Sequence, residues 1–204
     1  HLCQGCRPAE NVERLTLSLP PSAHHLQAAT RALCLGGVIA CPTEAVWGLS
    51  CDPSNEEAVM RLLALKDRPV TKGLILVAAT EEQLDFLLSG LTAEQRQTLS
   101  ASWPGPATWL LPHGGLVPSW VCGSHATVAL RVSSHPAVSA LCATWGGPLV
   151  STSANLAGAL PAREAYQVRR YFGDGLDYLL PGRVGAARRP TGIRDLFSGQ
   201  IIRD

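Results

Sequence analysis

Short apolar segments alternate with amphipathic segments along most of the chain, and this alternation restricts the possible folds more than any other feature. The apolar segments have the length and the Val, Ile and Leu content of buried strands. The expected strands are 37–41, 73–79, 107–112, 127–132, 148–153, 177–181 and 192–197. The expected helices are 23–35, 56–66, 81–88, 93–101, 135–145 and 163–172. Strands that alternate with helices are typical of an α/β sheet whose faces are covered.

The residues at several expected helix ends are of the types that helix termini require. Ser22 and Asn55 precede the first two helices, where their side chains can accept a hydrogen bond from a backbone N–H group of the first turn. Thr80 and Thr92 hold the same position before the next two helices. Pro136 stands at the start of the fifth helix, where its fixed φ angle suits the first turn. These signals support the expected helix boundaries.

The composition indicates a globular chain of one domain. Its 204 residues can bury a substantial core, and 46% apolar with only 16% charged residues argues against disorder. The net charge of +1 argues against a globally basic nucleic-acid binder, although arginines gather toward the C-terminal end. No apolar run approaches the ~18 residues of a membrane span, and no signal peptide is recognisable. We expect residues 1–21 to form an N-terminal extension and residues 22–204 to form the domain.

The cysteines indicate a reducing compartment. The chain has seven, an odd number, and they are scattered. Four stand in apolar contexts and are expected to be small buried hydrophobes: Cys34, Cys41, Cys51 and Cys142. Cys3 and Cys6 have the spacing of zinc ligands, but no second pair follows them. We therefore expect a cytoplasmic protein, and the sequence favours no zinc site.

Polar side chains gather near the ends of several expected strands and of one helix, where ligands of open α/β sheets bind. They are Thr43 and Glu44 after 37–41, Lys66 and Arg68 after 56–66, Arg131 within 127–132, and Ser151, Ser153 and Asn155 at the end of 148–153. Ser151 and Ser153 are two positions apart on a strand, so both can face one ligand. Serine and asparagine also occur in turns that cap helices, which is the alternative interpretation of this last group.

Lysine occurs only at positions 66 and 72, although the chain has 17 lysines and arginines in total. Two interpretations are open: lysine is kept where a compact ammonium is needed, or the two lysines stand together by chance. The common nucleotide-binding and hydrolase patterns, such as GxxxxGK[ST], GxGxxG, GxSxG and HExxH, are absent. His135, next to Pro136, is interpreted as a helix start and not as a catalytic base.

Five motifs in order resemble the YrdC/TsaC family, in its short bacterial form: "CPTEAVWGLSCDP", "LLALKDRPVTKGLILVAA", "WPGPATWLLP", "VALRVSSHP" and "PLVSTSANLAG". The resemblance runs from about residue 22 to residue 204. It implies a single-domain, twisted, mixed parallel and antiparallel sheet with flanking helices and a concave basic face. It also implies an activity: joining L-threonine, bicarbonate and ATP into threonylcarbamoyl-AMP with release of pyrophosphate, the first step of tRNA threonylcarbamoyladenosine modification.

The same resemblance assigns roles to individual residues. Its paired K-x-R and S-x-N signature gives the catalytic residues Lys66, Arg68, Ser153 and Asn155, which with Lys72 are also expected to bind ATP. The residues expected to bind threonine are Thr43, Arg131, Ser151 and Thr191. Mg²⁺ is expected to arrive with ATP and to bridge its phosphates, without a full set of protein ligands. Two departures concern the threonine contacts: Val77 replaces a histidine common in relatives, and residues 190–195 read "PTGIRD".

Two other functions remain open at this stage. One is an RNA-binding module without catalysis, which the arginine-rich C-terminal part would suit. The other is a carbamoyltransferase-type relative that acts on carbamoyl phosphate, although that domain usually belongs to a much longer chain. The favoured enzyme, a nucleotidyltransferase, would pass its product to a separate threonylcarbamoyl transferase complex. It would bind tRNA weakly at most and would not bind membranes.

Overall fold

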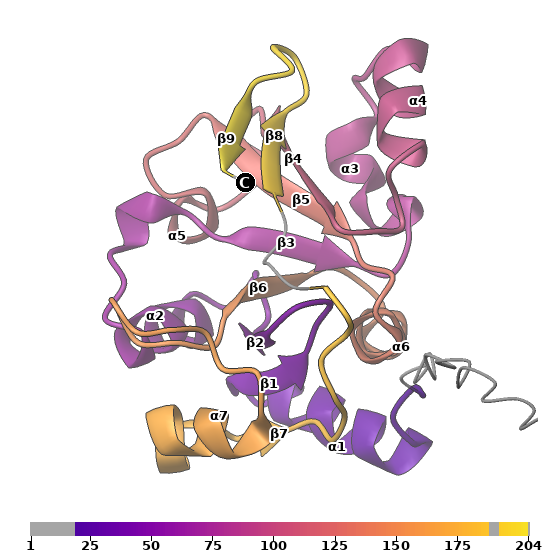
Figure 1. Ribbon diagram of the computed structural model, residues 1–204. Helices are drawn as coiled ribbons and strands as arrows, with labels where there is room; N and C mark the ends of the chain where they lie inside the picture. The colour runs from indigo at the N-terminus through magenta and orange to yellow at the C-terminus, as the bar shows by residue number, and fades with distance from the viewer. Residues whose placement is uncertain (1–18, 188–191, 204) are drawn as a thin grey trace, which may run out of the picture.

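The computed structural model describes residues 19–187 and 192–203 (Figure 1). Within these residues the strands form one nine-stranded sheet in the order β7-β1-β2-β6-β3-β5-β4-β8-β9. The strands are β1 (Ile39–Pro42), β2 (Trp47–Ser50), β3 (Ile75–Ala78), β4 (Ala107–Pro112), β5 (Thr127–Val132), β6 (Leu149–Ser153), β7 (Tyr178–Leu179), β8 (Gly192–Asp195) and β9 (Ile201–Arg203). The α-helices are α1 (Ala23–Cys34), α2 (Glu56–Leu65), α3 (Asp85–Leu88), α4 (Ala93–Ser100), α5 (Ser119–Cys122), α6 (Pro136–Trp145) and α7 (Ala165–Phe172).

The sheet is mixed, as the sequence analysis expects. β3 pairs with β5 in parallel, and so do β1 with β7 and β4 with β8. The remaining neighbours pair antiparallel, including β6 with both β2 and β3 at the centre. The chain therefore brings β6, β3 and β5 side by side although they lie far apart in sequence. The polar side chains on these strands can then share one site.

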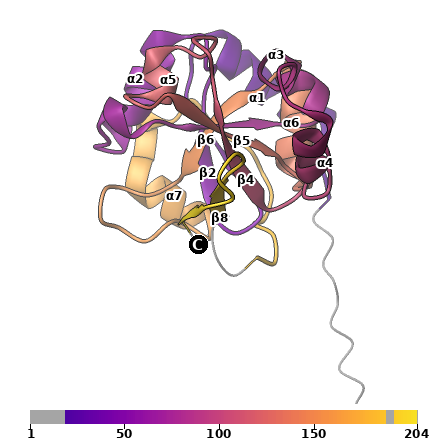
Figure 2. The same ribbon diagram turned by 90° about the horizontal axis from the view of Figure 1, so that it is seen from above.

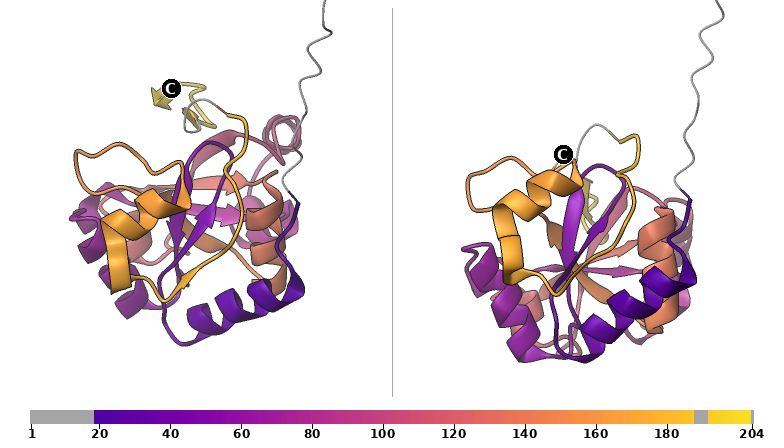
Figure 3. Two further views of the ribbon diagram at one scale, coloured as in Figure 1. Left: turned by 60° about the horizontal axis from the view of Figure 1, so that its bottom comes forward. Right: turned by 90° about the horizontal axis from the view of Figure 1, so that it is seen from below.

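The two faces of the sheet are covered unequally. Figure 3 shows α1 and α6 on one side of the sheet and α2 and α7 on the other, and Figure 2 shows the strong twist between the strands. The larger core joins α2, α4, α5 and α7 to alternate strand residues such as Leu76, Leu130 and Val150. The smaller core joins α1 and α6 to Ile39, Val77 and others. Helices α1 and α6 cover only part of the sheet face on which they lie (Figure 3).

The capping residues act as the sequence predicts at most helix starts. The side chain of Ser22 accepts from His25 N, and Asn55 Oδ1 accepts from Ala58 N at 3.0 Å. Thr92 forms a capping box with Gln95, which reaches back to the Thr92 N–H group. The segment after Thr80 differs from the prediction, because it begins as a 3-10 turn (Glu81–Leu84) in which the Thr80 side chain accepts no capping hydrogen bond from the backbone. Only its second half, α3, is α-helical.

The sequence analysis missed β2, β9 and the short helix α5. β2 reads Trp-Gly-Leu-Ser and lacks the β-branched residues that mark a strand, yet all four of its residues are buried. Its pairing with β1 through a tight turn at residues 43–46 makes it a strand, so tertiary pairing decides here and intrinsic preference does not. β9 is an edge strand at the end of the described chain with exposed Ile201 and Ile202.

Three of the four cysteines expected to be buried are buried: Cys41, Cys51 and Cys142. Burial raises the pKa of the Cys51 thiol to about 12 and that of Cys41 to about 11, so both stay protonated. The prediction for Cys34 is wrong: it is exposed, because α1 turns Ala29 and Leu33 toward the core instead. Cys3 and Cys6 lie outside the described residues. Among the described helices, none is both long and apolar enough to cross a membrane.

We expect Leu130→Ala to lower the free energy of unfolding by about 2–5 kcal/mol, because it opens a cavity in the larger core. Leu130 is fully buried at the centre of β5. The matched control is Leu35→Ala, at an exposed leucine just after α1, which should change the value by less than about 0.5 kcal/mol. Urea unfolding measures the free energy of unfolding of both variants. Equal effects of the two substitutions would contradict the assignment of the core.

Candidate active site

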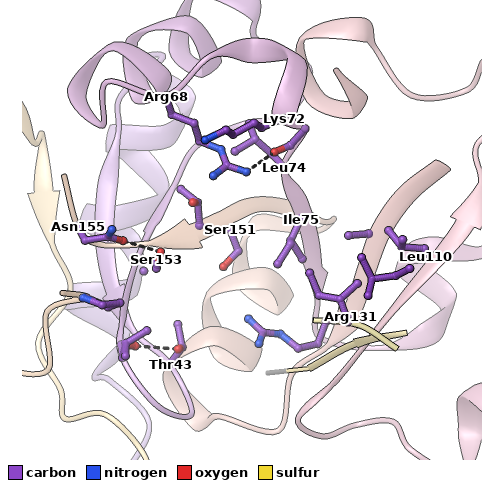
Figure 4. A pocket seen from close by; sticks show the side chains of 18 of the residues that line it. Thr43, Arg68, Lys72, Leu74, Ile75, Leu110, Arg131, Ser151, Ser153 and Asn155 are labelled. Carbon is purple, nitrogen blue, oxygen red and sulfur yellow. Dashed lines mark hydrogen bonds between the residues drawn. The ribbon is translucent and has the colours of Figure 1, made fainter. Parts of the chain in front are cut away.

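A cavity of about 690 Å³ lies on the uncovered part of the sheet, a size typical of small-molecule sites (Figure 4). Its floor is built from β2, β3, β5 and β6, and its rim from the residues after α2 and from β8 and β9. Ser151 and Ser153 both line it, as expected for alternate positions on one strand. Gly48 of β2 lies in this floor, and a side chain at its position would be crowded, because its Cβ would lie 3.2 Å from Thr43 Cγ2.

Arg68 and Lys72 line one end of the cavity. The chain reverses after α2 through Asp67, which has a φ of 49°, a left-handed conformation that aspartate tolerates better than most residues. Arg68 Nη2 donates to the carbonyl of Gly73 at 2.9 Å, and this bond fixes the side chain across the turn. Lys72 lies at the end of a 3-10 turn (Val70–Lys72) and is exposed. Two cations therefore face the same space, which suits a polyanionic ligand.

The Ser153–Asn155 segment forms the adjoining wall and is held by its own hydrogen bonds. Ser153 Oγ donates to Asn155 Oδ1 at 2.6 Å (Figure 4). Asn155 Nδ2 donates to the carbonyls of Leu156 at 3.0 Å and Ala159 at 3.1 Å. The amide of Ala154 donates to the Trp47 carbonyl at 2.7 Å, which ties the segment to β2. The segment is thus a preorganised turn with a hydroxyl group and an amide at the cavity.

Lys66 lies behind the cavity wall and outside its lining. Its ammonium donates to the carbonyl oxygens of Ser153 and Asn155, and lies 3.4 Å from Asn155 Oδ1. The residue is only 4% exposed. Burial, and secondly the nearby Arg68 charge, lowers the pKa of Lys66 to about 8. Lys66 therefore joins the loop after α2 to the Ser153–Asn155 segment, a role that its position in sequence did not reveal.

The residues expected to bind threonine gather at the other end of the cavity, apart from Thr191, which lies outside the described residues. Thr43, Ser151 and Arg131 all line this end. Figure 4 shows the Arg131 guanidinium pointing into the cavity toward the side of Thr43. Thr43 Oγ1 donates to the Val46 carbonyl at 2.7 Å, and Arg131 is 6% exposed. Val77, paired with Arg131 in the β3–β5 ladder, is buried in the smaller core.

Sequence reasoning missed the apolar walls and one histidine of the cavity. Ile75 and Leu110 line it from β3 and β4, Ile193 and Ile202 from β8 and β9, and His125 from the loop before β5. A sequence signal for Ile75 was present, because it stands two positions before Val77 in an expected strand and therefore faces the same side of the sheet. No such signal existed for Ile202, since β9 was not expected. These residues give part of the cavity an apolar lining.

The charge of the cavity lining is positive. Among the described residues that line it are three cations and no carboxylate. Nor do the described residues contain a cluster of three His, Cys, Asp or Glu side chains suited to a metal ion. Hydroxyl, amide and backbone oxygen atoms near the cations can still contact a metal carried by a bound anion. The arrangement fits an anionic ligand at one end and a carboxylate at Arg131.

The chain is similar to known proteins over most of its length. The family model named Sua5/YciO/YrdC, with the description "Telomere recombination", matches residues 31–204. A threonylcarbamoyl-AMP synthase of Saccharophagus degradans is 60% identical over 174 residues, which cover 85% of this chain and 91% of the relative. A threonylcarbamoyl-AMP synthase of Stutzerimonas stutzeri is 56% identical over 178 residues, 87% of this chain and 96% of the relative.

A solved structure shares the fold. The crystal structure of P. abyssi Sua5 complexed with L-threonine matches with a TM-score of 0.80 and 29% identity. The match covers 86% of this chain and 52% of the Sua5 chain, so the present chain spans about half of that protein. The twisted mixed sheet with flanking helices expected from the sequence is thereby confirmed.

The pKa of Lys66 predicts how stability depends on pH. Its folded pKa of about 8 lies below the ordinary value of 10.5, so the unfolded chain binds more protons between these values. The contribution of Lys66 to the free energy of unfolding should therefore increase as pH rises from about 8 to about 10.5. Urea unfolding of the unmodified protein and of Lys66→Met at both ends of this window measures it. A difference between the two proteins that stays constant across the window would contradict the burial of the charged ammonium.

Proposed function

The chain belongs to the Sua5/YciO/YrdC family, and we propose that it synthesises threonylcarbamoyl-AMP from L-threonine, bicarbonate and ATP, with release of pyrophosphate. One observation carries the proposal: a single cavity has Arg68, Lys72 and the Ser153–Asn155 segment at one end and Arg131 with Thr43 at the other. The first end suits phosphates and the second suits an amino acid, so both substrates can meet within it. The reaction is the first step of tRNA threonylcarbamoyladenosine modification.

The ATP phosphates are proposed to lie between the two cations and the Ser153–Asn155 segment. Arg68 can bind two phosphate oxygens with its planar guanidinium, and exposed Lys72 can follow charge as it moves. To donate to a phosphate oxygen, the Ser153 hydroxyl must turn from Asn155 Oδ1, or the Asn155 amide must exchange one of its two carbonyl partners. Lys66 contributes by holding that segment in place and by adding positive charge behind it. These groups stabilise charge through fixed positions, the main requirement in phosphoryl transfer.

Threonine is proposed to bind with its carboxylate on Arg131. Thr43 and Ser151 hydroxyls line the same end and can contact the amino or hydroxyl group of threonine. Thr191 remains a proposed contact on the family pattern alone. Val77 offers no polar contact, because it is 1% exposed and packed in the smaller core. This end of the site therefore depends on Arg131 for charge recognition.

The proposed reaction needs no nucleophile from the protein. Bicarbonate and the threonine amine form a carbamate with loss of one water molecule, and one carbamate oxygen bonds to the α-phosphorus of ATP. The bond from that phosphorus to the bridging oxygen of pyrophosphate breaks, and pyrophosphate leaves with the electron pair. The protein supplies positions, positive charge and exclusion of water by the apolar walls. The enzyme class proposed is accordingly a nucleotidyltransferase.

Mg²⁺ is proposed to enter with ATP. The cavity lining fits this route, because it offers hydroxyl and amide oxygens near Ser153 and Asn155 but no carboxylate among the described residues. A hard cation bound mainly by phosphates and water needs few protein ligands. When bound, the ion neutralises phosphate charge. Ser153 and Asn155 are the residues placed to contact its hydration shell.

The proposed setting is the cytoplasm, where a threonylcarbamoyl transferase complex would consume the product. Binding of tRNA to this chain is proposed to be weak and salt-sensitive, given the net charge of +1. The alternative function, an RNA-binding module without catalysis, has the C-terminal arginines in its favour. The internal cavity, with its buried Arg131, favours the enzyme. No single surface feature of the described residues requires RNA.

Pyrophosphate release from ATP tests the proposed function. We expect release to require both L-threonine and bicarbonate and to proceed without tRNA. L-serine should support a lower rate, by about 10- to 100-fold, because loss of a methyl contact costs only about 1–3 kcal/mol. L-valine, which lacks the hydroxyl, should also be poor. Equal rates with all three amino acids would refute the threonine assignment, and a strict need for tRNA would refute the proposal that the reaction is independent of RNA. Absence of pyrophosphate release under all these conditions would favour the RNA-binding module without catalysis.

Substitutions of the two lysines test their proposed roles in the same assay. Lys66→Ala should lower the rate by about 10²–10³-fold, because it releases the Ser153–Asn155 segment and removes charge near the phosphates. Lys66→Arg should not restore the rate, since a planar guanidinium does not fit the buried site of a compact ammonium. Lys72→Arg, at an exposed position, is the matched control and should be milder. A thermal melt checks folding; near-normal activity of Lys66→Arg would remove the argument for lysine.

A further inference from the structure

Glu44, which lies next to Thr43 in the turn between β1 and β2, has no role in the function proposed above. It is 9% exposed, although glutamate is seldom buried without a partner. One carboxylate oxygen, Oε2, lies 3.8 Å from Arg131 Nη1. The other, Oε1, accepts a hydrogen bond from Ser133 Oγ at 2.6 Å. A buried carboxylate held on both sides in this way has a defined orientation.

The group that holds Glu44 is itself anchored. Ser133 is two residues beyond Arg131 in sequence and 1% exposed, and its Oγ accepts from the amide of His135 at 3.1 Å. His135 Nδ1 accepts from Ala137 N at 3.3 Å, so Nε2 carries the proton and donates to the Arg183 carbonyl at 3.1 Å. Burial lowers the pKa of His135, consistent with a neutral ring. His135 thus caps α6, as the sequence predicts, and also supports Ser133.

The backbone around Glu44 is fixed from the opposite side. Gly185 N donates to the Thr43 carbonyl at 2.9 Å, and Ala187 N donates to the Glu44 carbonyl at 3.1 Å. A Cβ at position 185 would lie 2.6 Å from the Glu44 carbonyl oxygen, so the two segments are in close contact. The Thr43–Glu44 turn is therefore clamped between the 185–187 segment and the end of β5. With the backbone fixed, the carboxylate can leave Arg131 only by rotation of the side chain, which would break the bond from Ser133 Oγ.

We propose that Glu44 is a positioning residue for Arg131, holding its guanidinium toward the cavity so that it can receive the carboxylate of the amino-acid substrate. At 3.8 Å, the carboxylate oxygen neutralises the buried cation but lies beyond hydrogen-bonding distance of Nη1. Ser133 sets the orientation of Glu44 through the other oxygen. The inference rests on the proposed function, because it takes threonine as the ligand of Arg131.

Two opposing effects of Glu44 can be separated. Its negative charge repels a substrate carboxylate, which would make its removal improve threonine binding. Its contact with Arg131 fixes the guanidinium, so that removal would weaken threonine binding. The positioning effect should exceed the repulsion, because the guanidinium is 7% exposed and needs a partner to keep one orientation in a buried site. The sign of the change in threonine KM therefore decides between them.

The test is the kinetics of pyrophosphate release in Glu44→Gln and Ser133→Ala. Glu44→Gln should raise the KM for threonine by about 10- to 100-fold, because it removes the negative charge that holds the buried Arg131 guanidinium, with little change in the KM for ATP. Ser133→Ala keeps the charge of Glu44 and should raise the KM for threonine by a smaller factor, about 3- to 10-fold. In an Arg131→Lys background, Glu44→Gln should raise the KM for threonine by a much smaller factor than it does in the unmodified protein.

The matched controls are Glu81→Gln and Ser100→Ala, which break a carboxylate–serine bond of 2.8 Å away from the cavity and should leave both KM values unchanged. Two results in Glu44→Gln would overturn the inference: an equal rise in the KM values for threonine and ATP, or a fall in the KM for threonine. Ser133→Ala decides the matter if Glu44→Gln fails to fold in a thermal melt. Absence of threonine-dependent release from the unmodified protein would instead overturn the proposed function, and this inference with it.

Discussion

The site depends on the unequal covering of the two sheet faces. Strand side chains alternate between faces, so Leu76, Leu130 and Val150 enter the larger core while Ile75, Arg131 and Ser151 face the other way. Helices α1 and α6 cover only part of that second face. The uncovered part needs polar residues and forms a hollow. One geometrical rule thus provides the core that stabilises the fold and the cavity that binds ligands.

Two buried charged side chains then support the two ends of the cavity. Lys66 joins the loop after α2 to the Ser153–Asn155 segment, and Glu44 joins the β1–β2 turn to Arg131 on β5. Each connects segments that are far apart in sequence, and each places a charged group where burial is costly. Such contacts stabilise the fold weakly at best. Their value lies in holding the groups that meet the ligand in one arrangement.

The sequence predicted the α/β class, most helix starts and most of the polar side chains that line the cavity, because caps, apolar runs and alternate spacing are local signals. It did not predict β2, whose strand conformation comes from pairing, or exposed Cys34, whose side of α1 depends on helix rotation. It assigned Lys66 a catalytic role but did not predict that Lys66 is buried behind the cavity wall while Lys72 is exposed. The partner of Glu44 was equally hidden, as Ser133 lies 89 residues away.

The central claim is that both substrates bind together in the cavity on the uncovered sheet face. A crystal structure of the protein with L-threonine and a non-hydrolysable ATP analogue tests it most directly. The account predicts the threonine carboxylate on Arg131 and the phosphates between Arg68, Lys72 and the Ser153–Asn155 segment. Phosphates bound elsewhere, or threonine bound away from Arg131, would contradict it.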